Sequence, residues 1–330
     1  MRVRCSRRLP GEAAMRVSAF APGQRGRRSV GRASLLLFLL LYGGMGCSNL
    51  SPTVKARFKN YTLNYDTPVD ASLQAQLEML DSRLRAQLGM TPEQTAVGVL
   101  ELREMRVAMI RPDRIEYAAS VPKIGILFAY FQRHAEAATN LDSQTRRELG
   151  LMIKASDNTL AAKYSRELGL KTIQEALTGA GFYDARRGGG LWVGKHYGRG
   201  DERYGDPVGN HSHAATVRQL LRFYLFLEQG RLVSGAASKT MRELFASPDI
   251  PPVNDKFVKG LAGRDLQVLR KAGWWEDWFH DTAVVTGANR HYIIVAMTHH
   301  AKGDAYLEAF ARAVDELLVL KPAHARGLGP

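Results

Sequence analysis

The sequence predicts an α+β fold in which one antiparallel sheet is built from both ends of the chain, around an inserted all-helical subdomain. Two observations carry this prediction. Helical and strand-like patterns follow one another in the order helix, strands, many helices, strands, helix. The connections between neighbouring strand-like segments are also short, which favours antiparallel pairing over parallel pairing.

The elements follow from local patterns along the chain. Asp70 is a plausible N-cap for an amphipathic helix with leucines at helical spacing from Leu73 to Leu88. Apolar and β-branched residues then predict two strands, and strand character returns near the C-terminus before a last helix. The predicted strands are 95–104, 106–120, 266–275, 281–288 and 291–300. The predicted helical insert spans about 120–260, and the closing helix spans 305–320.

The first 46 residues have the pattern of a signal peptide. They contain nine arginines and one glutamate, and so supply +8 of the chain's net charge of +14. An apolar run from Ala33 to Tyr42 follows, and small residues precede Cys47, as in a bacterial lipoprotein signal, which this stretch resembles. The pattern predicts a lipid anchor at Cys47 and a location on the periplasmic side of a bacterial membrane. Secretion to the periplasm without a lipid, a short anchor left uncleaved and a start at Met15 are alternatives.

Composition excludes several function classes. The remaining net charge of +6 gives no reason to expect a nucleic-acid partner. The only cysteines are Cys5 and Cys47, so a thiol nucleophile, a thiolate metal site and a disulfide are excluded from the folded region. We expect a tether over 47–69, one folded domain over 70–322 and a short tail over 323–330.

Three polar clusters stand out from these elements. Ser120 and Lys123 form a Ser-x-x-Lys pair where a strand-like segment meets an apolar helix, and residues three apart on a helix share a face. Ser156, Asp157 and Asn158 follow within the helical region. The third cluster is a Lys-Ala-Gly, 271–273, on a predicted strand near the C-terminus. A capping serine beside a surface lysine would explain the first cluster alone, but not all three in this order.

The order and the setting of these clusters resemble the Ser-x-x-Lys, Ser-Asp-Asn and Lys-Thr-Gly elements of class A β-lactamases and penicillin-binding proteins. The resemblance covers roughly residues 70–320. It implies a three-layer α/β/α sandwich and a serine hydrolase that needs no cofactor and no metal. Its substrates would be β-lactams or the D-alanyl peptide amides that they mimic.

The resemblance also implies a role for each residue. Ser120 would be the acylated nucleophile and Lys123 its general base, which requires a neutral amine with a depressed pKa. Ser156 would relay a proton to the leaving nitrogen, Asn158 would bind the substrate's amide side chain, and Lys271 would attract its carboxylate. The oxyanion would be held by backbone N–H groups of Ser120 and of Trp274, just past Gly273. Asp157 would orient the turn.

Two departures from the family pattern limit the transfer of function. No glutamate follows the second cluster where class A β-lactamases have the base for deacylation. Asp184, Lys195 and Glu202 are possible substitutes, although each is more simply explained as a solvated loop residue. Ala272 replaces a threonine or serine, which removes a charge-assisted hydrogen bond of about 1.5–3 kcal/mol.

Several alternatives therefore stay open. The missing glutamate favours a DD-peptidase or another peptidoglycan amide hydrolase, and both departures motivate a non-catalytic cell-wall-binding lipoprotein on the same fold. The long loop from Asp184 to His213 is expected to be functional or mobile. The aromatic residues 274, 275, 278 and 279 could wall a substrate cleft or pack at a strand end. The histidine pairs 211/213 and 299/300 lack companions with metal-ligand spacing.

Overall fold

The computed structural model describes residues 52–319 except 199 and 201, and the described residues belong to one compact unit. The predicted signal peptide, Cys47 and the tail lie outside the described residues. Within this part of the chain, no helix is long and apolar enough to cross a membrane.

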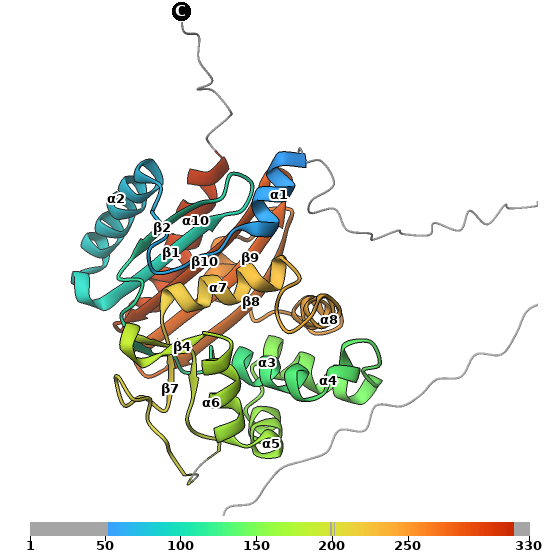
Figure 1. Ribbon diagram of the computed structural model, residues 1–330. Coiled ribbons are helices and arrows are strands. Elements are labelled where there is room, and N and C mark those ends of the chain that lie inside the picture. The colour runs from blue at the N-terminus through green and yellow to red at the C-terminus, as the bar shows by residue number, and fades with distance from the viewer. Residues whose placement is uncertain (1–51, 199, 201, 320–330) are drawn as a thin grey trace, which may run out of the picture. The chain divides into compact units, whose positions relative to one another are not determined.

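A five-stranded antiparallel sheet forms the centre of the fold, with the strand order β2-β1-β10-β9-β8. The first two strands come from the N-terminal part of the chain and the other three from the C-terminal part (Figure 1). The predicted α+β fold is therefore confirmed. The strands are β1 (Thr95–Glu101), β2 (Arg106–Ile110), β8 (Leu266–Trp275), β9 (Trp278–Gly287) and β10 (Arg290–His299).

Three helices cover one face of the sheet and enclose an apolar core that includes Leu77, Val97 and Phe310. These helices are α2 (Ala71–Leu88), α9 (Lys256–Gly260) and α10 (Gly303–Val319). Asp70 caps α2 as predicted, since its carboxylate accepts a hydrogen bond from the Leu73 N–H at 2.8 Å. The sequence predicts a helical insert that extends to about residue 260. The insert ends before α9, because the buried Phe257 packs α9 on this face of the sheet.

The helical subdomain adjoins the opposite face of the sheet. Its helix α7 packs directly on β1, where a Cβ on Gly98 would lie only 2.6 Å from the side chain of Val217. Figure 1 shows α3 to α6 gathered together on this side. The helices are α3 (Lys123–Arg133), α4 (Ser143–Gly150), α5 (Asn158–Leu168), α6 (Leu170–Gly179), α7 (Val217–Glu228) and α8 (Gly235–Ala246).

Short elements complete this side of the molecule. A π-helical turn, η3 (Leu151–Ala155), precedes the second polar cluster. The loop that begins near Asp184 contains or adjoins several very short strands, which pair with one another. These strands are β3 (Glu116–Tyr117), β4 (Tyr183–Asp184), β5 (Gly189–Gly190), β6 (Trp192–Val193) and β7 (His213–Ala215). Three 3₁₀ turns are η1 (Pro92–Gln94), η2 (Ala135–Ala138) and η4 (Ala185–Arg187).

The folded region begins earlier than the predicted boundary at residue 70. Helix α1 (Pro52–Asn60) lies within the segment expected as a tether, and Phe58 and Tyr61 pack against the main core. Leu63 is completely buried in that core. The sequence pattern concealed this because the buried residues are few and do not follow a helical or strand period.

Candidate active site

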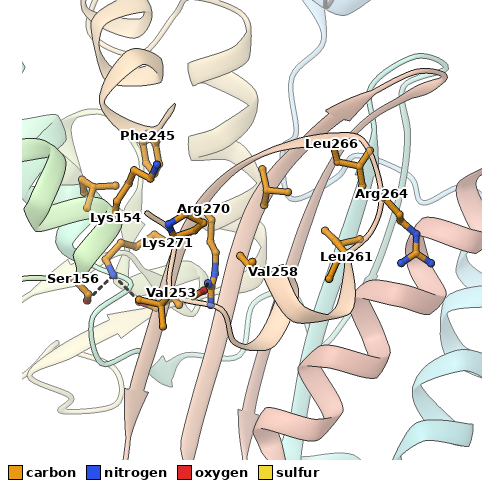
Figure 2. A pocket seen from close by; sticks show the side chains of 15 residues that line it. Lys154, Ser156, Phe245, Val253, Val258, Leu261, Arg264, Leu266, Arg270 and Lys271 are labelled. Carbon is orange, nitrogen blue, oxygen red and sulfur yellow. Dashed lines mark hydrogen bonds between the residues drawn. The ribbon is translucent and has the colours of Figure 1, made fainter. Parts of the chain in front are cut away.

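The three polar clusters converge at Ser156, which lies between η3 and α5. Its hydroxyl oxygen accepts a hydrogen bond from the Lys271 amine on β8 at 2.8 Å and one from the Lys123 amine on α3 at 3.3 Å. Figure 2 shows the first of these bonds. Residues separated by 33 and 115 positions in the sequence are therefore joined through one hydroxyl group. The structure brings together the polar side chains of Lys123, Ser156 and Lys271, one from each predicted cluster.

Lys123 is completely buried at the first turn of α3. Its amine also donates hydrogen bonds to the Ser156 carbonyl at 2.5 Å and to the Asn158 side-chain oxygen at 2.7 Å. Burial lowers the pKa of Lys123 to about 7, and the nearby charge of Asp157 opposes this shift. A substantial fraction of this amine is therefore neutral at neutral pH, as a general base requires.

Lys271 is buried in the same cluster, and only 1% of its surface is exposed. Besides Ser156, its amine donates to the Ala272 carbonyl at 2.7 Å. Burial lowers the pKa of Lys271 well below its ordinary value, and the charges of Lys123 and Arg270 lower it further. A substrate carboxylate would reverse part of this shift, because an opposite charge favours the ammonium form.

Ser120 lies in the turn that leads into α3. The sequence predicts a helix that begins at Ser120, but α3 begins at Lys123. The preceding Ala119 has a φ of +48°, a left-handed conformation that is rare for residues other than glycine. Strained backbone of this kind is concentrated at functional sites. In the part of the chain that the structure describes, no hydrogen bond joins the Lys123 amine to the Ser120 hydroxyl.

The backbone of Ser120 lies against β8 at Gly273. A Cβ on this glycine would lie 2.7 Å from the Ala118 carbonyl oxygen and 3.1 Å from the Ser120 nitrogen, so only glycine permits this approach. Among the described residues, the Ser120 N–H donates to no acceptor. It is therefore available to an oxygen bound beside Gly273 and Trp274, where the sequence analysis expects the oxyanion.

The turn at Ser156 is shaped by its neighbours. Ser156 adopts a left-handed conformation with a φ of +58°. Asp157 caps α5, because its carboxylate accepts a hydrogen bond from the Leu160 N–H at 2.8 Å. This agrees with the expected role of Asp157 in orienting the turn. Asn158 is exposed and begins α5, so its side chain can contact both Lys123 and a ligand.

None of the possible substitutes for the missing glutamate contacts the lysines in the described structure. The Asp184 carboxylate accepts from the Arg186 N–H, and Glu202 is exposed and bonds to Tyr204. Lys195 forms an isolated bridge with Arg203 at the base of its own loop.

Tyr197 instead approaches Lys123 from this loop. Its ring lies 4.7 Å from the Lys123 amine, and its hydroxyl donates to the Ala119 carbonyl at 3.2 Å. Burial raises the pKa of this tyrosine well above its ordinary value, so the group stays neutral. Sequence reasoning missed Tyr197, because a tyrosine in a glycine-rich loop carries no motif.

Of the aromatic residues after Gly273, some pack at the strand end and others are exposed where they could wall a cleft. Trp278 packs against His299, with parallel rings 3.8 Å apart, whereas Trp274 and Trp275 are mostly exposed beyond Gly273. In the residues that the structure describes, no group of three or more histidine, cysteine, aspartate or glutamate side chains is placed to hold a metal ion.

A model described as the beta-lactamase enzyme family matches residues 144–319, which is more than half of the chain. The chain therefore belongs to the beta-lactamase enzyme family. The matched region includes Ser156 and Lys271 and begins after Ser120 and Lys123. A search of curated proteins found no significant match.

Solved structures show the same fold at low sequence identity. A beta-lactamase from Sphaerobacter thermophilus has a TM-score of 0.60 at 14% identity, covering 75% of this chain and 98% of that one. The protein PBP-A has a TM-score of 0.57 at 18% identity, covering 78% and 98%. A class A beta-lactamase from Bacteroides cellulosilyticus has a TM-score of 0.56 at 14% identity, covering 73% and 97%.

The environment of Lys123 can be tested by titration. We expect a side-chain pKa near 7 in the intact protein and a lower value in Asp157→Asn, because removing a negative charge favours the neutral amine. Asparagine preserves the helix cap. NMR titration of isotope-labelled lysine side chains measures both values.

Asp249→Asn is the matched control for this titration. The charge of Asp249 raises the pKa of Lys154, so this variant should lower the pKa of Lys154 and leave that of Lys123 unchanged. A Lys123 pKa near 10 in the intact protein would contradict the account of the site.

Proposed function

We propose that the protein is a serine hydrolase that forms an acyl-enzyme at Ser120 with β-lactams or related D-alanyl peptide amides. The observation that carries the proposal is the pair of buried lysine amines that share the Ser156 hydroxyl, next to a strained turn that presents Ser120. A structural role alone gives no reason to bury two lysines in contact with one serine, because burying an amine is unfavourable.

The chemistry follows from these positions. The Ser120 oxygen attacks the substrate carbonyl carbon and transfers its proton to the neutral Lys123 amine after a side-chain rotation. The oxyanion accepts hydrogen bonds from the N–H groups of Ser120 and Trp274. The proton then passes from Lys123 through the Ser156 hydroxyl to the leaving nitrogen as the carbon–nitrogen bond breaks. Lys271 and Asn158 hold the carboxylate and amide groups of the substrate.

Release of the acyl group is expected to be slow. The side chains that contact the Lys123 amine in the described structure are Ser156, Asn158 and Tyr197, and none is a carboxylate. Among the described residues, the site therefore has no carboxylate base beside Lys123 to activate water for deacylation. This observation favours a second candidate, a DD-peptidase or another peptidoglycan amide hydrolase, over an efficient β-lactamase.

Covalent labelling tests the proposal. A fluorescent penicillin should label the domain from Ser48 onward, and Ser120→Ala should abolish the label. Intact mass measured over time should show slow decay of the adduct, because no carboxylate among the described residues contacts the Lys123 amine. Ser165→Ala is a matched control, because this buried serine bonds to Ala162 and His196 and contacts none of the cluster.

The outcomes separate the candidates. Rapid loss of the adduct would indicate an efficient β-lactamase and contradict the proposed deacylation defect. A folded protein that neither penicillin nor a D-alanyl-D-alanine peptide acylates would contradict the enzyme and favour a non-catalytic cell-wall-binding protein.

We further propose that the protein is anchored by a lipid at Cys47 on the periplasmic side of a bacterial membrane. The support is the sequence of arginines, apolar residues and small residues that precedes this cysteine. In a bacterial host, Cys47→Ser should move the protein from the membrane fraction to the soluble periplasmic fraction. Recovery of both forms in the same fraction, with no lipid mass on Cys47, would contradict the anchor.

A further inference from the structure

A cavity of about 280 Å³ follows the outer edge of β8 and begins at the catalytic cluster. Figure 2 shows Ser156 and Lys271 at one end, and Leu261 and Leu266 at the other. Pockets that hold a whole drug-sized ligand typically occupy about 300–1,000 Å³. This cavity is therefore suited to one part of a substrate whose reacting bond lies elsewhere.

The lining of the cavity is chiefly apolar. Phe245 and Val253 contribute from the helical subdomain and the loop after it, Val258 from α9, and Val268 from β8. None of the described residues that line it carries a carboxylate. The cavity would favour an apolar group of branched or aromatic shape, because burying apolar surface is the main favourable term.

The basic residues in the lining are already paired. Arg270 bonds to the buried Asp281 at 2.8 Å, and the Lys154 amine donates to the Ala246 and Ser247 carbonyls. Arg264 pairs with Asp315 at 2.9 Å. The two arginine charges are therefore offset by carboxylates of the protein, and the Lys154 amine is already hydrogen-bonded to carbonyls, so none of the three is free to select an anion.

The same contacts hold the cavity open. Arg270 donates to the Val253 carbonyl at 2.9 Å, which ties the loop after α8 to β8. Lys154 ties η3 to the end of α8. Both walls are fixed without a ligand, so little ordering is needed on binding.

Ala272 connects the cavity to the nucleophile. It lines the cavity, and the next residue, Gly273, lies against the Ser120 nitrogen. Ser156, the proposed proton donor to the leaving nitrogen, also lines the cavity. The substituent on that nitrogen therefore lies closest to the cavity entrance.

We propose that this cavity binds a large apolar side chain on the leaving amino acid, so that the preferred peptide substrates end in a leucine-like or aromatic residue rather than in alanine. This inference rests on the proposed function. In the reaction, the Ser120 oxygen–carbon bond forms and the amide carbon–nitrogen bond breaks. The leaving nitrogen receives the Ser120 proton, and the apolar amino acid departs.

The test compares acyl-D-alanyl-D-leucine with acyl-D-alanyl-D-alanine at a fixed acyl group. The second-order rate of Ser120 acylation, followed by intact mass, should be at least about tenfold higher for the leucine peptide, the discrimination typical of added methylene groups in an apolar pocket. Equal rates would overturn the inference and leave the proposed function standing.

Two substitutions test whether the cavity causes the preference for the leucine peptide over the alanine peptide. Val268→Trp fills the cavity, and Val253→Glu places a charge at its exposed rim. Each should reduce the preference toward unity and preserve the rate with the alanine peptide. Gln267→Trp is the matched control, because it lies on the same strand, is exposed and does not line the cavity. An unchanged preference in a folded cavity variant would overturn the inference.

A binding measurement separates this inference from the proposed chemistry. Calorimetry with the Ser120→Ala protein should show at least about tenfold tighter binding of the leucine peptide. If neither peptide acylates the intact protein, the proposed function fails. The calorimetric measurement then tests by itself whether the cavity binds an apolar side chain. Equal affinities would then overturn the inference as well.

Discussion

The hydroxyl of Ser156 is the point on which the site depends. It accepts hydrogen bonds from two buried lysine amines, one on the helical subdomain and one on the edge strand of the sheet. Burial lowers the pKa of both amines, and the charge of Lys123 lowers the pKa of Lys271 further. The fold therefore lowers the pKa of the lysine amines at the site, and a neutral amine is what the proposed general base for the serine requires.

The sheet, the three motifs and their convergence could be predicted from the sequence, because each depends on a regular period or on polar residues that apolar elements do not otherwise need. The leucine stripe of α2 and the strand that carries Lys271 are examples. Other features left no periodic signal. The buried Leu63 stands in an irregular segment, and Tyr197 reaches Lys123 only because the loop folds back on α3. Long-range placement of this kind is set by tertiary packing rather than by local pattern.

The two departures from the family pattern have structural counterparts. From the loop in which the family has a carboxylate, the ring of Tyr197 lies 4.7 Å from the Lys123 amine. Where a hydroxyl would help bind a carboxylate, Ala272 lines an apolar cavity. Both features support the proposal of slow β-lactam turnover and of a substrate with an apolar leaving group. The side chains of Lys123, Ser156 and Lys271 remain joined by hydrogen bonds.

The most direct measurement is a crystal structure of the protein after reaction with a penicillin. The account predicts a covalent bond from the Ser120 oxygen to the penicilloyl carbon, with the carbonyl oxygen accepting hydrogen bonds from the N–H groups of Ser120 and Trp274. Lys123 would lie within hydrogen-bonding distance of the Ser120 oxygen. A penicillin bound without a covalent bond, or an adduct on another residue, would contradict the assignment of Ser120 as the nucleophile.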